Sequence, residues 1–177
     1  MPRMHRPATL LLVAATAALS GCAPTAEPTP TTSEAVTGTP IPLSCAQLVP
    51  ASTITGLWAG FSPSDVADPT AVSREIAGYN GTVCGWTNGS GATLQLAVAH
   101  LRPQVIEALK NEFFTTSKAV PSYGTAPTVE GYFHVVEGRG VADVFIGEYW
   151  VETSSTSFVE PGDPEPLVRS ALQMLSS

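Results

Sequence analysis

Residues 82–101 read TVCGWTNGSGATLQLAVAHL, and this stretch decides how the rest of the chain folds. Residues 82–87 and 92–101 both have the composition and flanking turn residues that are typical of strands. Between them, Asn88 begins a tight turn, because Asn-Gly readily adopts positive φ. The stretch therefore predicts an antiparallel hairpin, in which one face of the second strand carries an alternating set: Leu94, Leu96, Val98 and His100.

The residues after the hairpin predict two longer helices and a meander. Pro103 opens an amphipathic helix over residues 103–116, and the chain ends on a second helix that Asp163 caps and Pro164 begins. Between them we expect three strands joined by glycine-containing turns, over residues 132–137, 141–146 and 148–153. The predicted fold class is α+β, a mainly antiparallel sheet of about five strands with the two longer helices packed on it.

The residues before the hairpin predict less regular structure. Ser44 caps a helical turn, Pro50 restarts the chain into a second turn, and residues 61–79 form a long loop with one helical turn around residues 71–76. Residues 117–131 form another loop. Aromatic side chains in or beside loops are common ligand or partner contacts, and the alternative is that they cover the open face of a small sheet. Four aromatic residues fit this description: Trp58, Phe61, Tyr79 and Tyr123.

The N-terminus has the parts of a bacterial export signal. Arg3 and Arg6 make it basic, and the apolar residues 9–19 are fewer than the about 20 that a spanning helix needs. The residues LSGC that end at Cys22 resemble the lipobox of bacterial lipoproteins, whose cysteine is lipidated and becomes the mature N-terminus. This resemblance implies that residues 1–21 are a signal peptide and that Cys22 carries diacylglycerol and an N-acyl chain. The alternative is an ordinary secretory signal.

A tether is predicted between the lipid and the folded domain. Residues 22–42 are rich in proline, threonine and small side chains and contain no aromatic residue, so they favour extended segments without a core. Residues 43–177 then form a single α+β domain. Because two or more acyl chains attach a protein stably to a bilayer, we expect this domain on the extracytoplasmic face of the cell membrane.

Charge and cysteine content narrow the possible partners. The chain has a net charge of −7, and removal of residues 1–21 leaves six basic residues against fifteen acidic ones. This balance argues against nucleic acid, whose phosphates need a basic patch. Once Cys22 carries lipid, Cys45 and Cys84 are an even pair in an oxidising compartment, which predicts a disulfide; the alternative is two reduced, buried thiols.

Two short motifs resemble a family of uncharacterised actinobacterial lipoproteins. The chain has Cys45-Ala-Gln-Leu48, a variable segment and then Cys84-Gly-Trp86, which is similar to the Cys-x-x-Leu…Cys-x-Trp pattern of that domain of unknown function. The resemblance spans roughly residues 43–177. It implies that the two cysteines are bonded and that Trp86 lies in the core beside them, and it implies no activity.

The sequence contains no clear catalytic or metal-binding motif. His100 and His134 lie on predicted strands, but their spacing is not that of metal ligands, so we interpret them as ordinary strand residues. Acidic residues that could complete a metal site with them in space are Glu107, Glu130 and Asp143. No Gly-x-Ser-x-Gly motif is present, and a serine hydrolase would need a Ser-His-Asp set assembled from distant loops. We expect no metal and no cofactor besides the lipid on Cys22.

These observations favour a non-enzymatic binding function. We expect the domain to bind a small molecule, an envelope component or a protein partner through the loops at 59–81 and 117–131. The alternative is an accessory or structural lipoprotein that docks on a membrane enzyme or transporter, which predicts a flat apolar patch in place of a pocket. A hydrolase is the third hypothesis.

Overall fold

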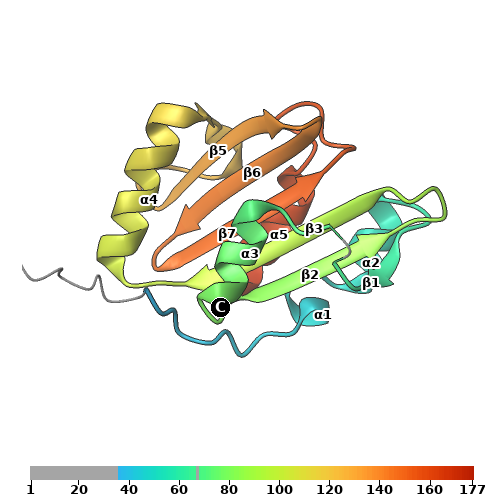
Figure 1. The fold of residues 1–177 in the computed structure, drawn as a ribbon, viewed down its shortest axis with the longest axis horizontal. Coiled ribbons are helices and arrows are strands. Elements are labelled where there is room, and N and C mark those ends of the chain that lie inside the picture. Colours follow the sequence, from blue (N-terminus) through green and yellow to red (C-terminus); the bar gives the residue numbers. More distant parts are fainter. Residues whose placement is uncertain (1–35, 67) are drawn as a thin grey trace, which may run out of the picture. The chain divides into compact units, whose positions relative to one another are not determined.

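The structure, a computed structural model, describes residues 36–66 and 68–177, which belong to one compact unit, Ala35–Ser177. Its centre is a seven-stranded antiparallel sheet with the strand order β1-β2-β3-β7-β6-β5-β4 (Figure 1). The predicted signal peptide, Cys22 and most of the predicted tether lie outside the described residues.

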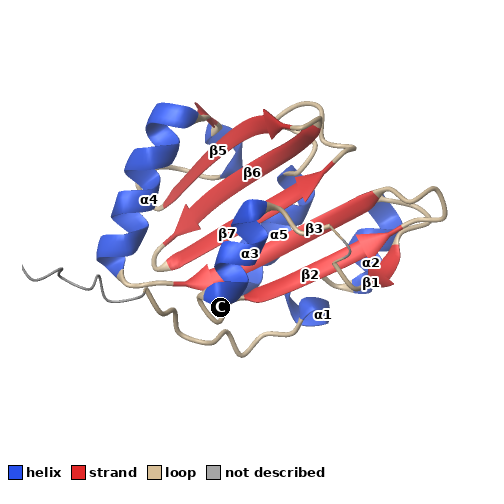
Figure 2. Cartoon of the chain, in the orientation of Figure 1, coloured by secondary structure: helices blue, strands red, loops and turns tan. Residues whose placement is uncertain are grey.

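The described part of the chain contains helices and strands in mixed order (Figure 2). The strands are β1 (Ser62–Ser64), β2 (Thr82–Thr87), β3 (Thr93–His100), β4 (Lys118–Ala119), β5 (Val129–Val136), β6 (Arg139–Ile146) and β7 (Tyr149–Ser155). The helices are α1 (Cys45–Leu48), α2 (Ala51–Leu57), α3 (Ala71–Gly78), α4 (Pro103–Thr116) and α5 (Glu165–Leu175), with a 3-10 turn at Pro121–Tyr123.

The helices cover both faces of the sheet (Figure 1). We call the side under α1, α2 and α5 the α5 face and the opposite side the α3/α4 face. Strand β3 contributes to both, because successive side chains of a strand point to opposite sides. Leu94 and Leu96 belong to the apolar cluster with α5, whereas Ala97 and Ala99 belong to the cluster with α3 and α4. The central strands are therefore buried on both sides.

The predicted hairpin is confirmed. Strands β2 and β3 pair from Thr82 opposite Val98 to Thr87 opposite Thr93. The turn differs in detail, because the positive φ of 81° falls at Gly91. Asn88 contributes through its side chain instead, whose Oδ1 accepts hydrogen bonds from the backbone N–H groups of two later turn residues, Ser90 and Ala92.

The α+β class is confirmed, but the prediction of about five strands is wrong. The additional strands, β1 and β4, lie in segments predicted as loops and form the two edges of the sheet. Strands of two or three residues have no alternation pattern, and these form by pairing with an existing edge. The single helical turn expected around residues 71–76 is the eight-residue helix α3, whose N-cap Thr70 accepts a hydrogen bond from the backbone N–H of Ser73.

The C-terminal helix has the predicted apolar stripe but a different start. Helix α5 begins at Glu165, after Pro164. Asp163 does not cap the helix; its Oδ2 accepts the backbone N–H groups of Val159 and Glu160 and so closes the preceding turn. The stripe packs on the sheet through four buried residues: Leu167, Val168, Ala171 and Leu172.

The predicted disulfide between Cys45 and Cys84 is confirmed, with a Cα–Cα distance of 5.6 Å. It joins α1 to β2, and Trp86 lies in the same apolar cluster. The residues just before α1 also contact the sheet, because Thr39 forms a bridge to His100. None of the helices between residues 36 and 177 that the structure describes has the length and apolarity needed to cross a membrane.

Candidate functional site

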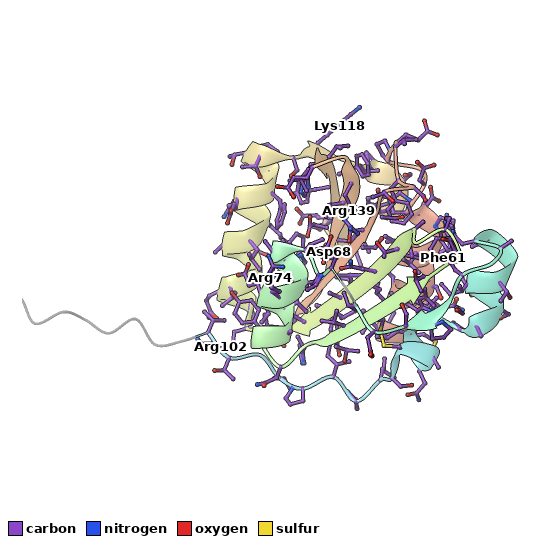
Figure 3. All side chains as sticks on the ribbon, turned by 45° about the vertical axis from the view of Figure 1, so that its right-hand side comes forward. Phe61, Asp68, Arg74, Arg102, Lys118 and Arg139 are labelled. Carbon is purple, nitrogen blue, oxygen red and sulfur yellow. A yellow bond between two sulfur atoms is a disulfide. The ribbon has the colours of Figure 1, made fainter. Side chains whose placement is uncertain are left out.

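A polar cleft of about 560 Å³ opens on the α3/α4 face. One wall is the segment that leads into α3, with Asp68 and Arg74, and the other is the β5–β6 hairpin, with His134 and Arg139. Glu152 of β7 lines it between these walls. Figure 3 shows Asp68, Arg74 and Arg139 near one another beside α3. Ionisable side chains from the segment around α3 and from the later strands β5 to β7 therefore meet in one concave site.

Glu152 lines the cleft from the sheet and is fully buried. Its carboxylate lies at the N-terminus of α3, where Thr70 Oγ1 donates to Oε1 at 2.8 Å and Ser73 Oγ donates to Oε2 at 2.6 Å. Burial raises the pKa of Glu152, whereas these hydroxyl groups and the charge of Arg139 act in the opposite direction. The carboxylate of Glu152 is therefore buried, and hydrogen bonds from two hydroxyl groups stabilise it.

Asp143 lies directly opposite Glu152 in the register of β6 and β7 and is also fully buried. The indole Nε1 of Trp150 donates to its Oδ1 at 2.9 Å, whereas its Oδ2 has no hydrogen-bond partner. Burial and, to a smaller extent, the charge of Glu152 raise the pKa of Asp143 well above its ordinary range. Two adjacent buried carboxyl groups do not both ionise readily, and Asp143, which has fewer hydrogen bonds, is the one whose protonated form is favoured.

His134 lines the cleft and also approaches Asp143. Its Nδ1 lies 3.8 Å from Asp143 Oδ2 and 3.4 Å from Ser117 Oγ, so a serine, a histidine and an aspartate do come together. Both contacts involve the same ring nitrogen, whereas a catalytic triad uses one nitrogen for each partner. This arrangement therefore lacks the geometry of a proton relay. Burial lowers the pKa of His134, which favours the neutral ring.

The two arginine side chains of the cleft already have partners. Arg139 lies 3.3 Å from a carboxylate oxygen of Asp68 and donates to Thr93 Oγ1 at 3.2 Å. Arg74 donates to the backbone carbonyl of Pro69. A carboxylate offers about four acceptor positions, and the hydroxyl groups of the α3 segment fill only some of those on Glu152. The cleft therefore keeps open acceptor positions on Glu152 as well as open N–H donors on Arg74.

The two histidines considered as metal ligands lie on opposite faces of the sheet. His100, at the end of β3, stacks on Tyr149 and lies 3.0 Å from a carboxylate oxygen of Glu148. His134 belongs to the α3/α4 face, where its ring lies 6.4 Å from that of Phe113. Across the ranges 36–66 and 68–177, no group of three or more histidine, cysteine or acidic side chains has a metal-binding arrangement.

The four loop aromatics predicted as ligand contacts do not share one surface. Phe61 and Tyr123 are 8% and 6% exposed, and both lie in the core of the α5 face. Trp58 packs beside that core, with its ring 6.4 Å from that of Phe158. Tyr79 packs on the α3/α4 face. The residues that line the polar cleft include none of these four aromatics, and their placement matches the alternative interpretation, in which they cover the sheet.

Sequence analysis did not identify Glu152, Thr70 or Ser73 as site residues, and it considered Asp143 only as a metal ligand. A signal was nevertheless present. Both acidic residues lie within predicted strands, Asp143 between Ala142 and Val144 and Glu152 directly after Val151. Such positions are buried in a central strand, and a buried acidic side chain is a common feature of functional sites.

Comparisons of the chain with protein-family models, with curated proteins and with solved structures gave no match. The resemblance to actinobacterial lipoproteins therefore rests on the short motifs around Cys45 and Cys84, and the function is argued below from the geometry of the cleft.

Proposed function

We propose that this protein is a lipid-anchored binding domain that holds a small polar ligand in the cleft at Glu152. The observation that carries the proposal is the pair of fully buried carboxyl groups, Asp143 and Glu152, beside this cleft. Burial of a carboxyl group opposes folding unless the group is well paired, and Asp143 Oδ2 has no hydrogen-bond partner. Two apolar side chains would fill the same space more favourably, so the pair supports a role in binding.

The export signal supports the same proposal. A domain attached through acyl chains at Cys22 meets small molecules and envelope components outside the cytoplasmic membrane. Detection of a mature N-terminus without lipid would contradict this part of the proposal directly. Mass spectrometry of the protein from its native membrane is expected to show an N-terminus at Cys22 that carries the mass of diacylglycerol and an N-acyl chain.

A pair of helix variants tests the cleft. Ala71 lines the cleft from the first turn of α3, and Ala77 is equally exposed on the same helix but is not among the lining residues. A library of small polar molecules is screened by ligand-observed NMR against the natural protein, Ala71→Trp and Ala77→Trp. We expect compounds whose binding is lost in Ala71→Trp and kept in Ala77→Trp. If every compound behaves alike with the two variants, the cleft is not a binding site.

The accessory function is the second candidate, and the exposed end of β5 favours it. Val135 and Val136 are 58% and 46% exposed, and Val136 also lines the cleft. Because neighbouring side chains of a strand point to opposite sides of the sheet, Val136 is the valine that a partner lying across the cleft opening would cover. Under this hypothesis, Val136→Asp abolishes co-purification of a crosslinked membrane partner, whereas Leu57→Asp, at an exposed position of α2 on the α5 face, does not.

A further inference from the structure

We propose that the ligand of the polar cleft carries a compact positive charge, an ammonium or guanidinium group, which binds against the carboxylate of Glu152. This inference rests on the proposed function, because it names the chemical class of the ligand for the same cleft.

The charges of the cleft favour a cation over an anion. An anion would normally be attracted to the N-terminus of α3, but the carboxylate of Glu152 already occupies that position through Thr70 and Ser73. The guanidinium group of Arg139 is engaged by Asp68 and Thr93. The lining of the cleft has three acidic residues and two basic ones: Asp68, Glu137, Glu152, Arg74 and Arg139. A second anion would therefore add to an excess of negative charge, whereas a cation would offset it.

The unpartnered oxygen of Asp143 is a second, independent observation. Asp143 is fully buried behind the cleft, directly across the strand pair from Glu152, and its Oδ2 lies near only the ring of His134. A cation on Glu152 reduces the negative charge that Asp143 faces, and this favours ionisation of Asp143. Binding of the cation is therefore expected to release a proton.

The other charged groups around Asp143 and Glu152 do not remove the effect of a bound cation on the ionisation of Asp143. On the α3 side these are Asp68 and Arg74, and on the hairpin side Glu137 and Arg139. Helix α4 presents the ring of Phe113 to His134, and the ammonium group of Lys110 on that helix is held by Glu107 and Glu130. The carboxyl pair is thus the group that a bound cation would influence most.

The apolar walls define the remainder of the ligand. Pro69, Val72, Val136 and Val141 line the cleft beside the charged groups. They suit a short aliphatic body attached to the cationic group, because methylene groups gain free energy from contact with buried valine side chains. Small alkyl amines and alkyl guanidines have this composition.

Trp150 provides the experimental reporter. Its indole N–H donates to Asp143, so the ¹⁵N-HSQC signal of that group responds to a change at the carboxyl pair. The chain has three tryptophan residues, and the indole groups of Trp58 and Trp86 serve as internal controls on the α5 face. Methylguanidinium and methylurea are the probes, because they have nearly the same shape and differ in charge.

We expect methylguanidinium to shift the indole signal of Trp150, with little effect on the signals of Trp58 and Trp86, and methylurea to have no effect. The shift is expected to disappear in Ala71→Trp and to persist in Ala77→Trp. Calorimetry in two buffers with different ionisation enthalpies is expected to show release of a proton on binding.

Two further variants change the affinity in opposite directions. Glu152→Gln removes the negative charge and is expected to weaken binding of methylguanidinium at least tenfold. Because Glu152 is buried and that variant can fail to fold, Arg139→Gln is the second test. It removes a positive charge from the wall of the cleft and is expected to tighten binding of the cation several-fold.

Each outcome distinguishes this inference from the proposed function. Equal shifts with methylurea, or no shift with methylguanidinium up to about 10 mM, overturn the cation inference, since even weak binding is visible at millimolar concentration. Under those outcomes the proposed function still stands if any other compound binds to Ala77→Trp and not to Ala71→Trp. If no compound separates the two variants, the proposed function fails as well.

Discussion

The two faces of the sheet are formed by the same strands but have different interiors. The buried residues of the α5 face are mainly apolar, with Leu96, Val151 and Leu167 among them. The α3/α4 face buries a polar group of side chains in addition to its aromatic cluster: Ser73, Gln95, Asp143 and Glu152. The α5 face therefore supplies stability, whereas the α3/α4 face carries groups that oppose folding unless they have partners.

This difference explains where the candidate site lies. Apolar burial is favourable in any orientation, so the α5 face needs only shape and volume. The carboxylate of Glu152 needs donors in particular directions, which Thr70 and Ser73 supply from another segment. Four experiments can break or sharpen the comparison.

The largest effect is expected on the α5 face from loss of the disulfide. Replacement of both Cys45 and Cys84 by serine removes a cross-link between residues 39 positions apart. In the chain-entropy model a loop of this length contributes about 4 kcal/mol to the free energy of unfolding. Urea denaturation followed by tryptophan fluorescence measures the loss. A loss near zero would mean that α1 is held to β2 by packing alone.

A core truncation on the same face is expected to have the next largest effect. Leu96 is fully buried in β3, and Leu96→Ala is expected to lower the free energy of unfolding by about 3 kcal/mol through lost burial and the remaining cavity. Leu109→Ala on α4 is the matched change on the other face, where the leucine is only partly buried and the expected loss is smaller. Equal losses in urea denaturation would contradict the division between the faces.

Replacement of the buried Asp143 is expected to change how the free energy of unfolding depends on pH. The pKa of Asp143 is raised in the folded protein, so above about pH 4 the folded state keeps a proton that the unfolded state releases. Its contribution to stability therefore falls as pH rises, by at most about 1.4 kcal/mol per pH unit, until the raised pKa is reached. We expect Asp143→Asn to remove this decline in a series of denaturation curves from pH 4 to pH 8.

His134 changes the pH dependence of stability in the opposite direction, so it needs its own control variant. Its pKa is lowered in the folded protein, so the unfolded state binds the extra proton and stability rises with pH up to about 6.5. His134→Gln removes that rise and leaves the contribution of Asp143. If Asp143→Asn has the same pH profile as the natural protein, the carboxyl pair is not the source of the decline.

The smallest effect is expected for an exposed ion pair outside both interiors. Arg169 on α5 pairs with Glu165 one turn earlier, and its side chain is 72% exposed. Arg169→Gln is expected to change the free energy of unfolding by about 0.5 kcal/mol or less, because water screens such pairs. A larger change in thermal denaturation would show that α5 depends on this pair as well as on its apolar stripe.

Periodicity predicted the longer elements with little error. Helix α4 spans the predicted residues 103–116, and β2 spans the predicted residues 82–87. The apolar residues of α4 recur with a helical period, and β2 has the composition of a strand next to a turn. The short edges β1 and β4 were missed because their pairing partners, rather than their own residues, determine that they are strands.

The candidate site was less accessible to sequence reasoning for a related reason. Asp143 and Glu152 are brought opposite each other by the tight connection between β6 and β7, so their pairing depends on a register that the residues alone suggest only approximately. The hydroxyl groups that support Glu152 come from Thr70 and Ser73, in a segment predicted as a loop. Nothing local in that segment indicates which carboxylate it will meet.

Local patterns in the sequence were enough to predict the α+β class, the main hairpin and the two longer helices, and the number of available cysteines predicted the disulfide. Only the tertiary structure decided that one face of the sheet would hold buried carboxyl groups next to a cleft. That outcome depends on the strand register and on the packing of α3 on β2 and β3, which brings its N-terminus to Glu152 of β7. Both are set by long-range packing that no single segment encodes.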